Sequence, residues 1–190
     1  MTVLLHALLL DIPEVVTTPR LTLAATRAGR GAEIRAAVHE SHAQLKRWMP
    51  WANEPQSEDD SEVHCRSMRA RWHAREELDF CVLRRADGLL VGKGGLHTID
   101  WSLPKFEIGY WVRASCAGQG FATEATAALA GMARGALGAV RLEIRSDARN
   151  APSRRVAEKC GFELEGILRR SRRDGEGALA DACVYAKVYP

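Results

Sequence analysis

The sequence predicts a single α/β domain, of the α+β kind, with the element order β-α-α-β-β-β-α-β-α-β-β. The chain has 190 residues, which is the length of one domain. Segments of alternating apolar and polar residues, typical of strands, are interspersed with segments of helical period. Only one strand–helix–strand crossover stands out, so a doubly wound dinucleotide-binding sheet is not favoured. We therefore expect about seven strands and about four helices.

The N-terminal part of the chain predicts a strand followed by a helix. Residues 20–26 alternate as a strand, and residues 29–47 have helical period until Pro50 stops the helix. The partly apolar face of this helix contains Ile34, Val38 and Leu45.

A second helix is predicted over residues 59–77, with Ser57 or Asp59 as its N-cap. Its polar residues are mostly Arg and Glu, which are typical of a solvated face. The expected buried stripe consists of Val63, Met68 and Trp72.

The middle of the chain predicts a hairpin and a further strand. Two apolar runs flank the sequence Ala86-Asp87-Gly88, and Asp-Gly is a strong signal for a tight hairpin turn. Residues 106–113 read FEIGYWVR and form the next strand. Alternation places Phe106, Ile108, Tyr110 and Val112 on one face and Glu107, Gly109, Trp111 and Arg113 on the other.

The C-terminal part predicts two helix–strand units and a closing hairpin. An Ala-rich helix over 120–134 ends near Gly135 and Gly138, and a strand over 140–145 follows. A short helix is then expected, with Asn150 as N-cap and Gly161 just past its end. The predicted ranges are 151–160 for that helix and 162–168 and 181–188 for the antiparallel pair that closes the chain.

Positive charge is concentrated in one segment. The whole chain carries 27 Lys and Arg against 24 Asp and Glu, a formal net charge of +3. Residues 134–173 alone hold eleven basic and five acidic residues, so their balance is 11 − 5 = +6. We therefore expect an acidic group to lie against this segment.

Cysteine usage and hydropathy indicate a cytoplasmic protein. The five cysteines are scattered and contain no C-x-x-C pair, so a disulfide framework is not expected. No set of His, Cys, Asp and Glu has metal-ligand spacing, so no metal is expected. The N-terminal apolar run, Val3–Leu10, lacks the flanks of a signal peptide, and no run is long enough to span a membrane.

A glycine-containing loop precedes the Ala-rich helix. Its glycines alternate at Gly118 and Gly120, which allows consecutive backbone N–H groups to face one point at a helix N-terminus. Such a loop suits a phosphate or pyrophosphate, although a simple turn explains the glycines equally well. The loop is neither a Walker loop nor the Rossmann fingerprint, because the Lys-Ser/Thr pair and the third glycine are missing.

Together with the motif Asn150-x-x-Ser153…Lys159-x-Gly161-Phe162, this loop resembles the GNAT superfamily of acetyl-CoA-dependent N-acetyltransferases. Within it, the chain is most similar to the RimJ/RimL branch, the ribosomal-protein-alanine acetyltransferases. The resemblance extends from Thr18 almost to the C-terminus and includes LKRWMPWA at 45–52. It implies a mixed, twisted sheet whose fourth and fifth strands splay apart to admit acetyl-CoA.

The resemblance also implies how acetyl-CoA is held. Pantetheine would pair with the backbone of Trp111, Val112 and Arg113, and Asn150 would hold the cofactor or cap its helix. Ala117 stands where the family usually has Arg or Gln, so we expect weaker phosphate binding rather than none. Arg154, Arg155 or Lys159 would bind the 3′-phosphate, with Arg113 and Arg149 as alternatives. The pyrophosphate would lie on the amides of Gly118, Gln119, Gly120, Phe121, Ala122 and Thr123.

Acyl transfer requires a neutral amine and a proton for the leaving thiolate. Glu107 is the first candidate for the base, since the family places a Glu there, and Glu77 is the second. By family analogy Ser153 hydrogen-bonds the thiolate. A serine hydroxyl is a far weaker acid than a thiol, so donation of a hydrogen bond is favoured over full proton transfer.

The acceptor is less well determined by the sequence. Trp48 and Trp51 are candidates for an acceptor wall, with core packing as the equal alternative. We expect an amine on a protein N-terminus, and a small amine such as an amino acid, polyamine or aminoglycoside is the alternative. A non-catalytic CoA- or nucleic-acid-binding module is the third hypothesis, based on the basic tract Arg169–Arg173. A nucleic-acid partner is not favoured, no membrane partner is expected, and a homodimer is possible.

Overall fold

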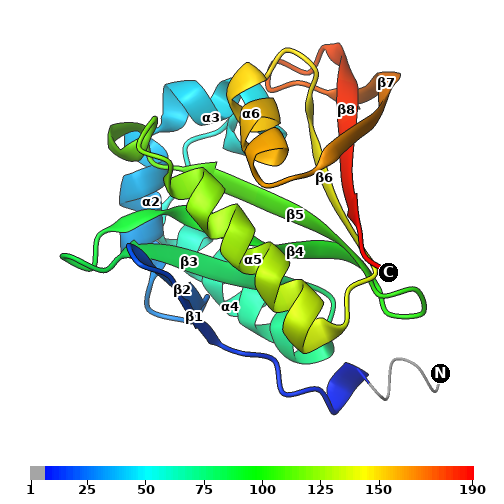
Figure 1. Cartoon of the computed structure of the whole chain (residues 1–190). Coiled ribbons are helices and arrows are strands. Elements are labelled where there is room, and N and C mark those ends of the chain that lie inside the picture. Colours follow the sequence, from blue (N-terminus) through cyan, green and yellow to red (C-terminus); the bar gives the residue numbers. More distant parts are fainter. Residues whose placement is uncertain (1–6) are drawn as a thin grey trace.

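The computed structural model describes residues 7–190, and the first six residues, which begin the N-terminal apolar run, lie outside it. The described chain forms one eight-stranded mixed sheet in the order β1-β2-β3-β4-β5-β6-β8-β7 (Figure 1). The strands are β1 (Val15–Thr17), β2 (Leu21–Ala25), β3 (Leu78–Arg84), β4 (Leu90–Asp100), β5 (Lys105–Val112), β6 (Arg141–Asp147), β7 (Glu163–Arg173) and β8 (Leu179–Val188). The predicted α/β class is confirmed. The additional strand is β1, which at three residues is too short to show a pattern.

The two halves of the sheet meet at its only parallel pair within the described chain, β5 and β6. Three residue pairs join them, and the last is Glu107 with Glu143. Beyond it, β5 continues to Val112 and β6 to Asp147 without pairing to each other, and the two strands diverge (Figure 1). The splay between the fourth and fifth predicted strands is therefore present, and it leaves one edge of β5 open.

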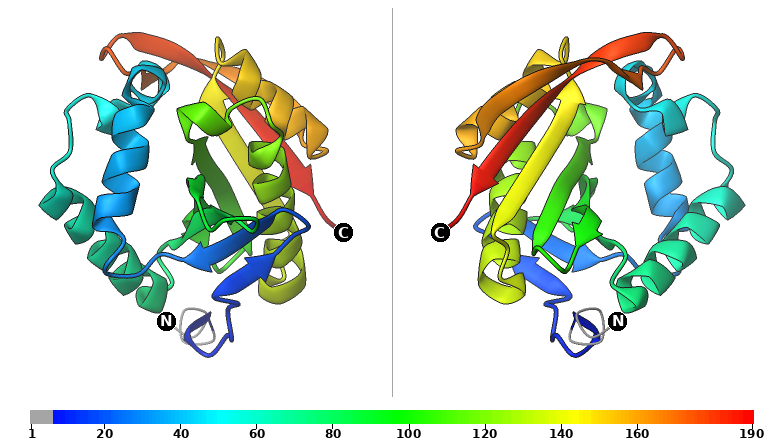
Figure 2. Two further views of the ribbon diagram at one scale, coloured as in Figure 1. Left: turned by 90° about the vertical axis from the view of Figure 1, so that its left-hand side faces the viewer. Right: turned by 90° about the vertical axis from the view of Figure 1, so that its right-hand side faces the viewer.

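Helices cover both faces of the sheet. In Figure 2, α5 and α6 lie on one face, and α2 and α4 lie on the other. Phe106 and Ile108 on β5 are buried with Leu129 of α5 in the main core. The helices are α2 (Gly31–Glu40), α3 (His42–Trp48), α4 (Glu58–Ala74), α5 (Phe121–Leu137) and α6 (Ala151–Lys159), with short 3-10 turns η1 (Pro50–Ala52) and η2 (Ala114–Cys116).

The predicted helix over 29–47 is two helices, and this prediction was wrong. The chain breaks at Ser41, which is buried and belongs to neither α2 nor α3. Its Oγ donates to Ala37 O at 2.7 Å and accepts from Ala114 N at 2.9 Å. A serine that bonds backbone groups in this way competes with the helix ladder. The break lets α3 turn toward the far end of the sheet.

The predicted stripe of α4 was partly wrong. Val63 is 64% exposed, whereas Met68 and Trp72 are buried as expected. The buried stripe is Ser61, Cys65, Met68 and Trp72. These positions recur every three or four residues, and Val63 lies off that line. Of the two predicted N-caps, Ser57 and Asp59, the structure has Ser57, which forms a capping box with Asp60.

The closing hairpin is longer than predicted and folds back over the sheet. Its strand β7 contains a bulge, because Leu168 pairs with Ala182 while Arg172 pairs with Ala180. Arg170 within the bulge has φ 50°, and its N–H donates to the Asp181 carboxylate. At the tip, Gly175 packs so closely on the C-terminal end of α3 that a Cβ there would overlap Lys46 O. The basic tract is therefore the bulged part of a hairpin that reaches α3.

Candidate active site

The glycine loop opens α5 and presents unused backbone donors. Gly118 and Gly120 have φ of 74° and 81°, the left-handed region that glycine adopts at least cost. Among residues 7–190, no hydrogen bond has a backbone N–H of residues 118–123 as its donor. A Cβ on Gly118 would meet no atom within 4 Å, so the loop faces open space. The loop therefore presents free backbone N–H groups at a helix N-terminus, an arrangement that suits an anion.

An ion pair holds this loop from behind. Glu124, in the first turn of α5, accepts from Thr18 Oγ1 at 2.6 Å and from Arg20 Nε at 2.6 Å. The same guanidinium donates to Gln119 O at 3.0 Å. Burial raises the pKa of Glu124, but the hydrogen bonds from Thr18 and Arg20 outweigh it and lower that pKa overall. Glu124 therefore has the structural role that its position suggests, and it anchors the loop to the start of β2.

Most of the predicted phosphate-binding cations already have partners. Arg113 pairs with Glu40 at the end of α2, and Arg149 pairs with Asp147 and Asp174. Arg154 donates to Tyr185 Oη and Ala148 O. Arg155 and Lys159 are exposed on α6, and neither forms an ion pair or a hydrogen bond through its side chain within the described residues. They remain the cations free to bind a phosphate.

Ser153 faces the splay from α6. Asn150 caps the helix, since its Oδ1 accepts from Ser153 N at 3.2 Å. Across the gap, Tyr110 Oη lies 3.0 Å from Ser153 Oγ and 3.1 Å from Ser153 O. Burial raises the pKa of Tyr110 to about 12, so the phenol stays protonated. Sequence reasoning placed Tyr110 only on the core face of β5, and its contact with Ser153 depends on the packing of α6.

The backbone of Trp111 and Val112 lies on β5 beyond the last pair with β6. One edge of these residues pairs with β4, through Lys93 and Gly92. The other edge has no strand partner, because the β5–β6 ladder ends at Glu107. An extended amide-containing chain can pair there as an additional strand does.

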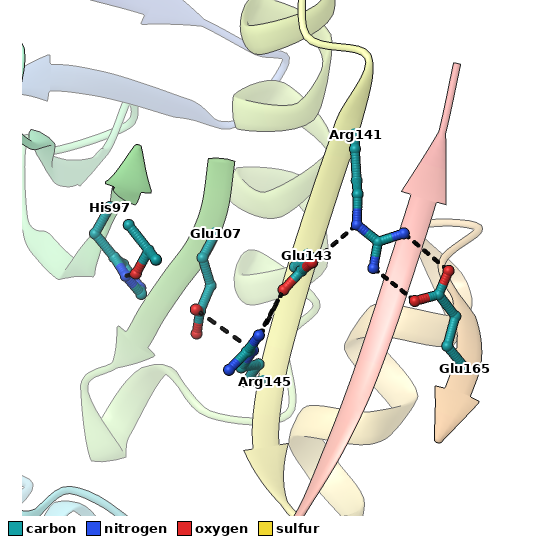
Figure 3. A network of polar contacts seen from close by, with 7 residues as sticks. His97, Glu107, Arg141, Glu143, Arg145 and Glu165 are labelled. Atoms are coloured by element: carbon teal, nitrogen blue, oxygen red, sulfur yellow. Dashed lines mark hydrogen bonds and ion pairs between the residues drawn. The ribbon is translucent and has the colours of Figure 1, made fainter. Parts of the chain in front are cut away.

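Glu107 lies at the point where the strands part. Its carboxylate is 3.7 Å from Arg145 Nε on β6, and its antiparallel partner on β4 is His97 (Figure 3). Arg145 also pairs with Glu143 at 3.1 Å, and Glu143 pairs with Arg141 at 2.8 Å. The side chain of Glu107 is 16% exposed. The carboxylate is therefore partly accessible from the face of the sheet opposite α5.

Two pockets open on that face. The larger, which we call the tryptophan pocket, has a volume of about 560 Å³, and Trp51 and Trp111 face each other in it with ring centroids 6.4 Å apart. Glu77 also lines this pocket and pairs with Arg71 at 2.9 Å. The structure thus brings together the predicted residues Trp51 and Glu77, but it places Glu77 in a different pocket from Glu107.

The second pocket, which we call the arginine pocket, has a volume of about 400 Å³. It is lined by Glu107, Arg145, Arg172 and Arg173 together with apolar residues that include Pro50 and Leu168. The side chain of Trp48 lines neither pocket. Its ring lies against Arg47, and its carbonyl accepts from Arg172 at 2.7 Å. That hydrogen bond joins the β7–β8 hairpin to the C-terminal end of α3.

A buried polar cluster forms the floor of the tryptophan pocket and was not predicted. Lys93 is 5% exposed, and its Nζ lies 2.6 Å from Asp79 Oδ2 and 2.8 Å from His64 Nε2. Thr26 Oγ1 donates to the same Asp79 oxygen at 2.6 Å. Burial, and then the nearby Lys93 charge, lower the pKa of His64. These residues come from four separate elements or loops, so no local motif indicates them.

Among residues 7–190, no group of three or more His, Cys, Asp and Glu lies together as a metal site would require. No helix in this part of the chain is long and apolar enough to cross a membrane.

Comparisons with known proteins agree with this geometry. Residues 20–163 match the model of the acetyltransferase (GNAT) domain. The chain is 31% identical over 133 residues to the "Putative ribosomal N-acetyltransferase YdaF" of Bacillus subtilis, covering 70% of this chain and 72% of that protein. The structure of Mycobacterium smegmatis RimJ in complex with CoA-disulfide is similar with a TM-score of 0.84 and 26% identity, over 93% of this chain and 88% of that one. A RimL ribosomal L7/L12 acetyltransferase in complex with coenzyme A is similar in fold, with a TM-score of 0.85 and 21% identity over 92% and 98% of the two chains.

Proposed function

Because the chain belongs to the acetyltransferase (GNAT) family, we propose that it transfers an acetyl group from acetyl-CoA directly to a primary amine, and that this amine is the N-terminal α-amine of a protein. The observation that carries the proposal is the splay of β5 and β6 after Glu107, with unused loop amides at one side and Ser153 at the other. The name of the B. subtilis relative, a ribosomal N-acetyltransferase, supports a protein acceptor.

The residues around the splay fit acetyl-CoA. The amides of residues 118–123 suit the pyrophosphate, the open edge of β5 suits the pantetheine amides, and Arg155 and Lys159 suit the 3′-phosphate. Bound in this way, acetyl-CoA supplies the thioester that reacts. Ala117 contributes no side-chain donor, but the backbone amides of the loop are intact.

Glu107 is the proposed proton acceptor. An α-amine has a reference pKa of about 7.7–8.0 and a lysine amine about 10.4, so an α-amine is the easier group to deprotonate near neutral pH. The carboxylate of Glu107 accepts that proton directly or through one water. Glu77 is held by Arg71 at the tryptophan pocket, and we assign it a role in binding the acceptor.

Ser153 and Tyr110 act on the leaving group. Ser153 Oγ–H donates a hydrogen bond to the sulfur as the thioester bond breaks. In this step the single Oη–H of Tyr110, which stays protonated, donates to Ser153 Oγ, so that the serine hydroxyl is free to donate to the sulfur. The serine thus stabilises the thiolate by a hydrogen bond and need not lose its own proton.

The test is a turnover screen of acetyl-CoA against N-terminal peptides and small amines, read by mass spectrometry. We expect peptides to be acetylated on the α-amine, with Glu107→Gln lowering kcat/KM about 100-fold. Glu165→Gln, which removes an exposed carboxylate of the same ionic network, is the matched control and should retain activity. Acetylation of small amines alone would favour the small-amine alternative, and thiol release with no amine at all would contradict the proposal.

A further inference from the structure

We propose that the arginine pocket binds a carboxylate of the acceptor, so that the enzyme prefers amines that carry an acidic group within one or two residues. This inference rests on the proposed function and specifies its substrate class. The pocket brings together three guanidinium groups, those of Arg145, Arg172 and Arg173, with Glu107 as its one acidic lining residue in the described chain.

The position of the pocket connects it to the reaction. Glu107 lines it, and Glu107 lies at the last residue pair before β5 and β6 diverge. An amine that reaches Glu107 therefore places its neighbouring groups inside the arginine pocket. One residue of extended chain spans about 3.3–3.6 Å, so the second and third residues of a peptide remain within the pocket.

The guanidinium groups have donors to spare. Arg172 uses one N–H for Trp48 O, and Arg173 uses one for Gly177 O, both at 2.7 Å. Arg145 pairs with Glu143 and Glu107. Each guanidinium has five N–H donors in a planar fork that matches a carboxylate. In the described residues no carboxylate lies within ion-pair distance of Arg172 or Arg173. The charge of Arg172 is close enough to Asp147 to lower the pKa of that carboxyl, so the charge of Arg173 is the more available to a ligand.

Two other ligands fit the pocket less well. We assign the CoA phosphates to the glycine loop and α6. Glu107, which lines the arginine pocket, lies on the opposite side of the sheet from α5, because its strand neighbours Phe106 and Ile108 pack against α5. A nucleic acid would need an extended basic surface, and two of the tract's arginines instead make internal hydrogen bonds to Trp48 O and Gly177 O. A peptide that carries a short carboxylate fits a pocket of about 400 Å³ whose lining also includes Pro50 and Leu168.

The experiment measures kcat/KM for pairs of peptides that differ only by Asp or Asn at position 2 or 3. We expect an acidic preference of about tenfold in the wild type, since hydrogen bonds to charged groups have this strength. Arg173→Gln should abolish the preference, Arg173→Lys should retain most of it, and Arg173→Glu should reverse it toward peptides with Lys. Arg145→Gln should lower it as well, together with kcat, because Arg145 also contacts Glu107.

The matched control is Arg169→Gln, in the same tract but outside the pocket, which should leave both activity and preference unchanged. Free amino acids and peptide amides are assayed as well. Their kcat/KM values show whether the pocket recognises an α-carboxylate or an acidic side chain. Equal turnover of acidic and neutral peptides, or a preference that survives Arg173→Gln, would overturn the inference and leave the proposed function standing. Competition by a short RNA but not by acidic peptides would assign the pocket to phosphates and also overturn it. Absence of any amine acetylation would instead remove the proposed function.

Discussion

The two faces of the sheet present their functional groups in different ways. On the side of α5 and α6, the groups are backbone amides, an open strand edge and a capped helix, each of which lies within one short segment. On the side of α2, α3 and α4, they are charged side chains from distant segments, such as Lys93 with Asp79 and Arg172 with Trp48. Under the proposed function the first side is the cofactor side, which any acetyl-CoA enzyme could share, and the second is the acceptor side, which is free to vary with the acceptor.

The largest effect is expected from the buried cluster on the acceptor side. Lys93→Met leaves the mostly buried Asp79 carboxylate with one neutral partner, Thr26. We expect a loss of about 3 kcal/mol in the free energy of unfolding, measured by urea denaturation. The double variant Lys93→Met/Asp79→Asn should recover part of it, because no charge is then left unpaired. A loss as small as that of an exposed ion pair would contradict the stabilising role of the Lys93–Asp79 pair.

The next effect concerns the cofactor side. Gly120→Asp adds a side chain at φ 81° and a negative charge among the amides of the loop. We expect the Kd for acetyl-CoA to rise about 100-fold in calorimetry, from backbone strain and charge repulsion together. Gly131→Asp adds the same charge in the exposed middle of α5, where a Cβ meets nothing within 4 Å, and should leave the Kd nearly unchanged. An equal rise in Kd in both variants would show that the added negative charge weakens binding wherever it is placed, and not specifically in the loop.

A smaller effect separates binding from chemistry on the cofactor side. Ser153→Ala should lower kcat about tenfold, because the thiolate loses one hydrogen bond, while the Kd for acetyl-CoA stays close to that of the wild type. Tyr110→Phe should lower kcat less. The double variant should be little slower than Ser153→Ala, because the two residues act through one contact. Additive losses would contradict the coupling.

The smallest effect tests the contact between the end of α2 and the segment that follows β5. Glu40 at the end of α2 accepts from Ser115 and Arg113, and these hydrogen bonds lower its pKa from 4.5 to about 2. Since the folded pKa is the lower one, the contribution of Glu40 to stability is fully present above pH 4.5 and is lost as the pH falls through about 2. Glu40→Gln should therefore flatten the acid side of a stability profile over that window. Glu163→Gln, an exposed carboxylate on β7, is the control and should leave the profile's shape unchanged.

Much of the cofactor side could be predicted from the sequence. The glycines at 118 and 120, the cap at Asn150 and the alternation of β5 are local patterns, and each led to the correct element. The acceptor side could not be predicted to the same degree. Val63 was placed in the core because it is apolar, although the stripe of α4 is set by Cys65, Met68 and Trp72. The role of Ser41 as a helix break depends on Ala114, 73 residues later.

By itself, the sequence determined the α/β class, the family, the glycine loop before α5 and most of the order of elements, because backbone conformation and hydrophobic period are properties of neighbouring residues. It missed the short β1 and the division between α2 and α3. Tertiary structure decided which side chains meet. It placed Tyr110 on Ser153, buried Lys93 between Asp79 and His64, and brought the basic tract to Glu107 through the folded-back hairpin. These contacts join residues far apart in the chain, and the free energy that holds them comes from the packing of whole elements, which no local pattern records.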